Sequence, residues 1–283
     1  YHENAFGRTW ESNAPHVRTD AEKAAAKAQY ATQAAQREAQ LQTERDEAAI
    51  ECKRLWGMAH DADRSHAYLA NKGVQAYGLK VLNGALLVPV YDGKNAIDNL
   101  VSMQFIQTEG SKRCKTGGKK QGGYFSFGST DTQTVVICEG YSTGASIAEA
   151  MGHRVVVAFD AGNLMPVSQR IASTLPDGWT MIIAADNDAY GVENKGLIQA
   201  TAAAQSTGAL LAVPCFDGVD VSTQPTDFND LHQLAGVEAV KAAFAPENLI
   251  KPMVMQGDGE VSSLTTPIEE TNEPYKPTSH NQA

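Results

Sequence analysis

The sequence lacks the closely spaced cysteines that a structural zinc site needs. Its four cysteines stand far apart, at positions 52, 114, 138 and 215, and no Cys-x-x-Cys pair occurs. We therefore expect no zinc ribbon in this stretch of chain. Scattered cysteines of this kind are typical of reduced thiols in a cytoplasmic protein.

Long apolar runs are missing as well. The sequence contains no stretch of about 18 apolar residues, which a membrane-spanning helix requires, and no secretory signal is visible. We expect a cytoplasmic protein with no membrane partner. Because the sequence begins at Tyr1 rather than at Met, we also expect a fragment or a processed product.

An excess of positive charge is the third absence. The chain carries 23 Lys and Arg residues against 33 Asp and Glu residues, for a formal net charge of −10. Nucleic-acid-binding domains are usually basic, so the overall charge argues against that class of protein. A local basic patch would still be sufficient, because contacts with phosphates depend on the cations nearby.

Two short apolar runs stand at the centre of the sequence, and each ends in acidic residues. Residues 135–138 precede Glu139, and residues 181–185 precede Asp186 and Asp188. Both runs are continuous and contain β-branched residues, and a helical pattern follows each, which is typical of strands buried in a parallel sheet. Ligands of such sheets bind beyond the carboxyl ends of the strands. We therefore expect the three carboxylates to converge at one edge of one sheet.

Carboxylates that lie so close together repel each other unless a cation neutralises them. Ligand sets made only of oxygen favour Mg²⁺ or Mn²⁺ over zinc, and two such ions would support phosphoryl or nucleotidyl transfer. Asp160, which ends another predicted strand at this edge, is a further candidate ligand. Asp227 and Asp230 either form a second acidic corner or cap a helix. Alternatively, Glu139 is a surface acid and residues 186–188 cap a helix.

The central region is predicted to be a series of βα repeats. Its strands are expected at residues 135–138, 154–159, 181–185 and 209–214, with helices between them. Right-handed crossovers would make all four strands parallel and would place helices on both faces of the sheet.

Upstream of this region we expect a long helix at residues 19–56. Thr19 and Glu22 have the spacing of a capping box, and the segment is rich in good helix formers. Large apolar residues are sparse in it, which favours a largely solvated connecting helix over one docked along its whole length. A small antiparallel or mixed sheet should follow, with strands at residues 86–91, 100–107 and 124–127.

A basic loop lies within this small sheet region, at residues 112–120. It combines two glycines with five cations and no acid; the cations are Lys112, Arg113, Lys115, Lys119 and Lys120. Glycine allows the backbone to approach a phosphate, and the cations release counterions from a nucleic acid. We interpret the loop as a contact for phosphate or template; the alternative is a solvated hairpin loop.

These patterns divide the chain into four parts. We expect an N-terminal segment with the long helix at residues 1–56, a small α+β subdomain at 57–130, an α/β domain at 131–245 and a disordered tail at 246–283. The tail prediction depends on a composition rich in Pro, Thr and Glu with almost no aromatic residues.

The ordered set of motifs resembles the Toprim domain, and within it the plasmid- and phage-type DNA primases. Residues 139–144 read Glu-Gly-Tyr-Ser-Thr-Gly, which is similar to the Glu-Gly-Tyr-Ala-Thr-Ala signature of those primases. An Asp-x-Asp follows about 45 residues later, and residues 86–90, 102–106, 110–113, 160–164 and 227–230 agree with the same group. The resemblance covers roughly residues 56–245. It departs from the complete family architecture, in which a zinc-binding module precedes the catalytic core.

The resemblance implies an α/β fold: a Toprim-type parallel sheet flanked by helices, preceded by a small α+β subdomain and a long N-terminal helix. It implies a DNA-dependent primase, a nucleotidyltransferase that makes short RNA primers for plasmid or phage DNA replication or conjugation. Glu139, Asp186 and Asp188, with Asp160 as a possible fourth ligand, would bind Mg²⁺ or Mn²⁺, and Asn163 would join the basic loop in contacting nucleotide.

The partners that the resemblance implies are single-stranded DNA, ribonucleotides, and a replicative helicase or a zinc-binding module on the same or another chain. Two other functions use the same residues. A Toprim nuclease would direct water at the phosphate, and a non-catalytic module would only bind single-stranded DNA during replication.

Overall fold

The computed structural model describes residues 2–3, 9–10 and 19–253 of the chain. Within the first eighteen residues it gives only a two-stranded antiparallel pair, β1 (His2–Glu3) and β2 (Thr9–Trp10). Most of the predicted tail, residues 254–283, lies outside the described residues. None of the described helices is long and apolar enough to cross a membrane.

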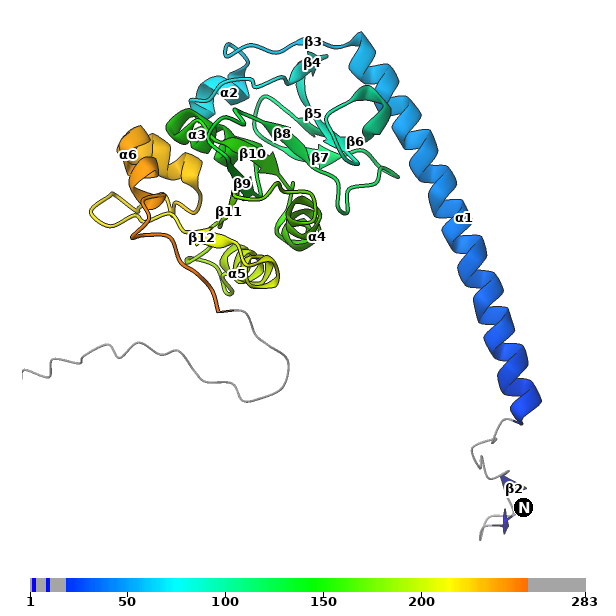
Figure 1. The fold of residues 1–283 in the computed structure, drawn as a ribbon. Helices are drawn as coiled ribbons and strands as arrows, with labels where there is room; N and C mark the ends of the chain where they lie inside the picture. Colours follow the sequence, from blue (N-terminus) through cyan, green and yellow to red (C-terminus); the bar gives the residue numbers. More distant parts are fainter. Residues whose placement is uncertain (1, 4–8, 11–18, 254–283) are drawn as a thin grey trace, which may run out of the picture.

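The long helix α1 (Asp20–Met58) begins at a capping box, as the sequence predicts. The Thr19 hydroxyl accepts a hydrogen bond from the Glu22 amide at 3.2 Å, and the Glu22 carboxylate accepts one from the Thr19 amide at 2.7 Å. Only Ala48 and Cys52 of the helix are buried. Its C-terminal part packs on the rest of the protein and its N-terminal part projects away from it (Figure 1).

An antiparallel sheet follows α1. Its strands are β3 (His60–Asp61), β4 (Lys80–Leu82), β5 (Ala85–Tyr91), β6 (Leu100–Ile106) and β7 (Lys112–Cys114), in that spatial order. The short helix α2 (Ala67–Lys72) lies between β3 and β4, and the 3₁₀ turn η1 (Ile97–Asn99) precedes β6. Every residue of the apolar strand β5 is buried, which explains why this strand is central in the sheet. The basic strand β7 is the exposed edge strand.

A second sheet, mostly parallel, has the order β12-β11-β9-β10-β8. Its parallel strands are β9 (Thr134–Cys138), β10 (Arg154–Val157), β11 (Thr180–Ala184) and β12 (Leu210–Ala212). The helices that connect and follow them are α3 (Tyr141–Met151), α4 (Ala161–Ala172), α5 (Lys195–Thr207) and α6 (Phe228–Ala243). The predicted α/β fold with its preceding subdomain and long helix is confirmed.

The helices cover both faces of this parallel sheet, and alternate strand residues face each layer. Val136 and Cys138 of β9 pack in the core on the side of α3 and α6, whereas Val135 and Ile137 pack on the side of α4 and α5. The two pairs of helices contact each other on their respective faces (Figure 1). The strands are apolar throughout because both of their faces are buried.

The strand predicted at residues 124–127 belongs to a different sheet from the one expected. As β8 (Phe125–Phe127) it pairs antiparallel with β10, with Phe127 beside Val155. Phe127 also contacts the ring of Tyr141 of α3 in a tilted arrangement, with ring centroids 5.5 Å apart. The strand is too short for its pattern to select a partner, so the open edge of β10 and this aromatic contact decide where it pairs. Tyr124, just before it, bridges to Tyr91 of β5 and so joins the two sheets.

The start of the predicted tail also differs from the expectation. Ile250 pairs with Leu211 of β12 through two backbone hydrogen bonds, of 2.8 and 2.9 Å. The other side of β12 pairs with β11, so the chain near Ile250 covers the remaining edge of that strand. Composition does not reveal this contact because an edge strand bonds through its backbone groups.

Candidate active site

Three of the predicted acids follow neighbouring strands at their carboxyl ends. In the sheet register, Ile137 of β9 lies beside Ile183 of β11, and Cys138 of β9 lies beside Val157 of β10. Glu139, Asp186 and Asp160 come one to three residues after these paired positions. The register therefore brings the ends of the three strands to the same edge of the sheet.

The charges of these carboxylates influence one another. Burial, followed by the charges of Asp160 and Asp188, raises the pKa of Glu139 above its ordinary value. Burial, followed by the charges of Asp227, Glu139 and Asp188, raises the pKa of Asp186 well above the ordinary value. We call Glu139, Asp160, Asp186, Asp188 and Asp227 the acid cluster. Burial and the neighbouring charges disfavour the ionised forms of Glu139 and Asp186, which is the behaviour of carboxylates that a cation would stabilise.

Asp186 has an oxygen for which the protein supplies no partner. Its Oδ1 is buried and makes no hydrogen bond. A buried acceptor without a donor is unfavourable by about 1–3 kcal/mol, and more if it is charged. Such atoms are uncommon in folded proteins and call for an explanation, of which an ion is one.

The loop after β11 is held in a fixed shape by Asn194. The amide of Asp188 donates to Asn194 Oδ1 at 2.8 Å, and Asn194 Nδ2 donates to Asn187 Oδ1 at 2.7 Å. Asn194 also caps helix α5 by accepting from the amide of Leu197. One side chain therefore shapes the Asp-x-Asp loop and begins the following helix.

Gly196 allows the start of α5 to approach the two aspartates. Its amide donates to Asp188 Oδ2 at 2.9 Å. A Cβ atom at this position would lie 2.6 Å from the carbonyl oxygen of Asp186 and 3.0 Å from Asp188 Oδ2. Only glycine fits here without moving the backbone that carries both acids.

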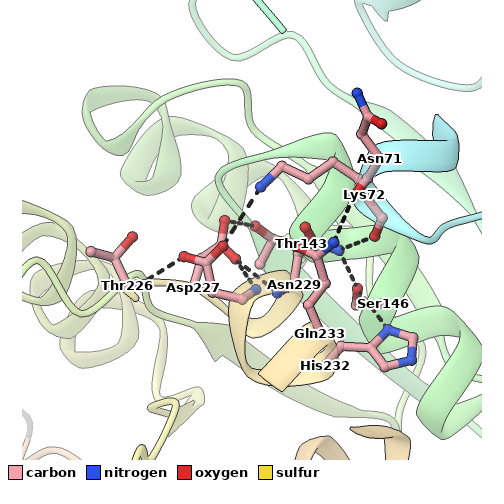
Figure 2. A network of polar contacts seen from close by, with 10 residues as sticks. Asn71, Lys72, Thr143, Ser146, Thr226, Asp227, Asn229, His232 and Gln233 are labelled. Atoms are coloured by element: carbon pink, nitrogen blue, oxygen red, sulfur yellow. Dashed lines mark hydrogen bonds and ion pairs between the residues drawn. The ribbon is translucent and has the colours of Figure 1, made fainter. Parts of the chain in front are cut away.

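Asp227 caps α6 and also belongs to the acid cluster. Its Oδ1 accepts from the amides of Asn229 and Asp230, both at 2.8 Å, and its Oδ2 accepts from the Thr143 hydroxyl at 3.1 Å (Figure 2). Burial is the largest cause of its raised pKa, and the charge of Asp230 is the second. The two roles that the sequence left open for this residue, helix cap and acidic corner, coexist.

Asp230 lies beside Asp227, on the side towards α2. Its carboxylate accepts from the Thr226 amide at 3.0 Å and pairs with the Lys72 ammonium at 3.6 Å. The interaction links α6 to the region before the parallel sheet. The Asp230 carboxylate therefore has two partners within the protein, the Thr226 amide just before α6 and Lys72 at the end of α2.

A buried polar network around Asn229 was not predicted from the sequence. Asn229 Nδ2 donates to the carbonyl of Lys72 at 2.8 Å and to Ser146 Oγ at 3.0 Å, and His232 Nδ1 lies 3.1 Å from the same Oγ (Figure 2). The network connects α2, α3 and α6 close to the start of α6, where Asp227 lies. An Asn between two Asp residues at a helix start gives no sign from sequence that its side chain is fully buried.

The basic loop divides into cations that face acids and cations that do not. Lys119 pairs with Asp92, which also pairs with Arg170, and Lys120 pairs with Asp160 of the acid cluster. Lys112, on the exposed strand β7, has no such ion pair among the described residues, yet its charge acts to lower the pKa of both Glu139 and Asp186. Lys112 is therefore the cation of the basic loop that is best placed to contact a ligand bound at the acid cluster.

The two remaining cations of the loop form no ion pair with the acid cluster within the described residues. Arg113 is exposed on β7. Lys115 lies beside the C-terminal half of α1, where it lines a pocket of about 280 Å³ together with Glu44 and Glu47. The loop therefore does not present its five cations as one patch.

Asn163 is buried and uses its side chain within the protein. Its Nδ2 donates to the carbonyls of Gly123 and Ala158 at 3.0 and 2.8 Å, and its Oδ1 accepts from the Gly122 amide at 2.7 Å. These bonds fix the end of the basic loop against the end of β10. The side chain is buried and already bonded to backbone groups of the protein, and we do not include it in the proposed binding site.

Across residues 19–253, no three His, Cys, Asp or Glu side chains are arranged closely enough to hold a metal ion as they stand. The acid cluster nevertheless fits a hard cation chemically, because it combines oxygen donors, mutual repulsion and the unpartnered Oδ1 of Asp186. Asp160 and Asp188 point oxygens at Lys120 and the Gly196 amide instead.

Comparison with known proteins agrees with this architecture. Residues 134–238, which contain Glu139, Asp186 and Asp227, match the family model described as a Toprim domain. The segment that carries the parallel strands and the acid cluster thus matches the Toprim domain, and the resemblance found in the sequence is confirmed.

The curated relatives are two proteins named DNA primase TraC, both from Escherichia coli. One is 33% identical over 230 residues, which are 77% of this chain and 16% of the relative. The other is 36% identical over 161 residues, 53% of this chain and 15% of the relative. The chain thus spans about a sixth of the length of these relatives.

Among solved structures, the primase fragment of the bacteriophage T7 primase-helicase protein is similar to this chain. The TM-score is 0.46 and the identity is 14%, over 66% of this chain and 75% of that one.

Proposed function

We propose that this chain is the catalytic core of a DNA primase, which joins ribonucleotides into short RNA primers on single-stranded DNA. The observation that carries the proposal is the acid cluster at the carboxyl edge of a Toprim sheet, with a buried carboxylate oxygen that lacks a partner. The similarity to TraC primases extends beyond the Toprim domain to 77% of the chain, which favours primer synthesis over nuclease activity. Such primers would serve plasmid or phage replication or conjugation.

Glu139, Asp186 and Asp188 are the residues that would hold Mg²⁺ or Mn²⁺, with Asp160 beside them. When bound, divalent ions of this kind neutralise the phosphate oxygens during nucleotidyl transfer and lower the pKa of the attacking hydroxyl. The protein's own contribution is to keep these acids at fixed positions. Asn194 and Gly196 fix the Asp-x-Asp loop, and the β9–β11 register fixes Glu139 relative to it.

The template and nucleotides would approach from the side of strand β7. Lys112 carries an exposed positive charge close enough to act on Glu139 and Asp186. A phosphate group bound between Lys112 and a metal ion would be neutralised from both sides. Arg113, next to it on the exposed edge strand, would extend this contact along a single strand.

Incorporation of labelled ribonucleotides on single-stranded DNA tests the proposal. The wild-type chain should produce short RNA with Mg²⁺ or Mn²⁺, and Asp186→Asn should abolish it while preserving the fold. Asp177→Asn is the matched control, because Asp177 is an exposed acid before the opposite end of the same strand β11. Cleavage of the template without incorporation would establish the nuclease alternative. Binding of DNA without either reaction would establish a non-catalytic module.

A further inference from the structure

A pocket in the Toprim domain adjoins the Asp-x-Asp loop, which carries Asp186 and Asp188. The pocket, of about 400 Å³, opens between this loop and residues 213–225. Asn187 and Ala189 line it, and these residues alternate along the chain with Asp186 and Asp188 of the acid cluster. The amide of Asn187 also donates to the carbonyl of Thr226 at 2.7 Å, which holds the two loops together. The pocket and the acid cluster therefore share one loop.

The lining of the pocket is suited to a flat, uncharged group. Tyr190 and Phe216 supply two aromatic rings, and Val213 and Val221 add aliphatic surface. None of the lining residues is basic, and Asp217 is acidic. A phosphate would be repelled here, whereas a planar ring could stack on an aromatic side chain. The volume is within the range of pockets that bind small molecules.

We infer that this pocket, which we call the base pocket, holds the nucleobase of a nucleotide whose phosphate lies at the acid cluster. The inference depends on the proposed function, because it assigns the base of a primase substrate to a place beside the proposed metal ligands. The nucleobase belongs either to the incoming ribonucleotide or to the 3′ end of the primer. Tyr190 is the stacking residue, since it is 45% exposed and free to lie against a ring.

The position of Cys215 allows a direct binding test. This cysteine lines the base pocket and is exposed, whereas Cys52 and Cys138 are buried. Cys114 is the other exposed cysteine within residues 19–253, so Cys114→Ser leaves Cys215 as the reactive thiol of that part of the chain. In this variant the rate of alkylation by N-ethylmaleimide is measured, with mass spectrometry to locate the label. The reaction is run with Mg²⁺ alone, Mg²⁺ and ATP, Mg²⁺ and tripolyphosphate, or Mg²⁺ and a short RNA oligonucleotide.

A base in the pocket predicts that ATP slows alkylation of Cys215 several-fold and that tripolyphosphate does not, because tripolyphosphate has no base. Protection by the RNA oligonucleotide but not by ATP would assign the pocket to the primer end. Equal protection by ATP and tripolyphosphate, or no protection by either ATP or RNA, would overturn the inference. This readout does not require primer synthesis, so it remains valid even if the proposed reaction is not observed.

Kinetics supply the second test. Stacking of a base on an aromatic ring contributes about 1–3 kcal/mol, so Tyr190→Ala should raise KM, for the ribonucleotide or for the primer end, on the order of 10-fold. Tyr190→Phe should keep KM near wild type, because the ring is retained. Val192→Ala is the matched control, since Val192 is fully exposed on the same loop but does not line the pocket. An unchanged KM in Tyr190→Ala, with primers still made, would contradict the base pocket and leave the primase proposal standing.

Discussion

The hydroxyl of Thr143 donates a hydrogen bond of 3.1 Å to Asp227, a residue 84 positions later in the chain. Thr143 lies in the first turn of α3, just after Glu139, and Asp227 begins α6. The bond thus fixes the turn that carries the first acid of the cluster against the helix on the same face of the sheet. It also satisfies one oxygen of a carboxylate whose burial is unfavourable.

Loss of this bond should destabilise the protein. Thr143→Val keeps the shape of the side chain but leaves the Asp227 oxygen without its donor. The free energy of unfolding should fall by about 1–3 kcal/mol, the usual effect of an unsatisfied buried group. Chemical denaturation measures this change. Thr143→Ser retains the hydroxyl and should lose much less, and equal losses in the two variants would show that the hydrogen bond is not the cause.

Burial of Asp186, together with repulsion from the neighbouring acids, should make stability depend on pH. The pKa of Asp186 is raised in the folded state, so the folded protein binds more protons than the unfolded chain above the ordinary pKa of aspartate, about 3.9. Stability should therefore fall as pH rises from there through the raised pKa of the folded state. Asp186→Asn removes the contribution of Asp186 to this dependence and should be more stable than wild type at neutral pH without divalent ions. Denaturation at a series of pH values checks it, and a less stable Asp186→Asn at neutral pH would argue against the repulsion.

Gly196 should be intolerant of any side chain. In Gly196→Ala the new Cβ would lie 2.6 Å from the carbonyl oxygen of Asp186, so the loop that carries Asp186 and Asp188 must move. We expect primer synthesis to fall at least about 100-fold, because small displacements of reacting groups have effects of that size. Gly57→Ala is the control: Gly57 lies in α1 with open space around it. That variant should be fully active and slightly more stable.

Lys112 should carry more of the nucleic-acid affinity than the paired lysines do. It has no ion pair among the described side chains, whereas Lys119 is neutralised by Asp92. For single strands, each phosphate contact contributes about 0.7 to the slope of log affinity against log salt concentration. Lys112→Ala should therefore weaken binding and reduce that slope by about 0.7. Lys241→Ala, on the exposed face of α6 and paired with Glu238, should change neither.

The convergence of the acids could be predicted because it depends on short-range pattern and a general rule of sheets. Buried strands in this chain are continuous apolar runs, and residues after parallel strands must meet at one edge. The positions of Glu139 and Asp186 at this edge follow from those two facts alone. The capping box of α1 is likewise a local signal, readable from Thr19 and Glu22.

What could not be predicted depends on partners far away in the chain. Lys120 is read in sequence as one of five free cations, but it pairs with Asp160, forty residues later. Asn163 follows a strand that ends at the site, yet its side chain is buried and bonded to four backbone groups. The strand β8 has only three residues, and it pairs with β10 of the mostly parallel sheet instead of joining the antiparallel sheet. Each outcome was decided by tertiary contacts that local propensity does not encode.

In the proposed function, the acid cluster binds divalent cations for chemistry on nucleotides. Anomalous scattering from crystals soaked in Mn²⁺ tests it most directly. The account predicts Mn²⁺ peaks in contact with Asp186 and Glu139, with Asp188 turned from the Gly196 amide towards the ion, and no such peaks in Asp186→Asn crystals. Saturating Mn²⁺ that leaves these carboxylates unoccupied, or that binds only elsewhere on the protein, would contradict it.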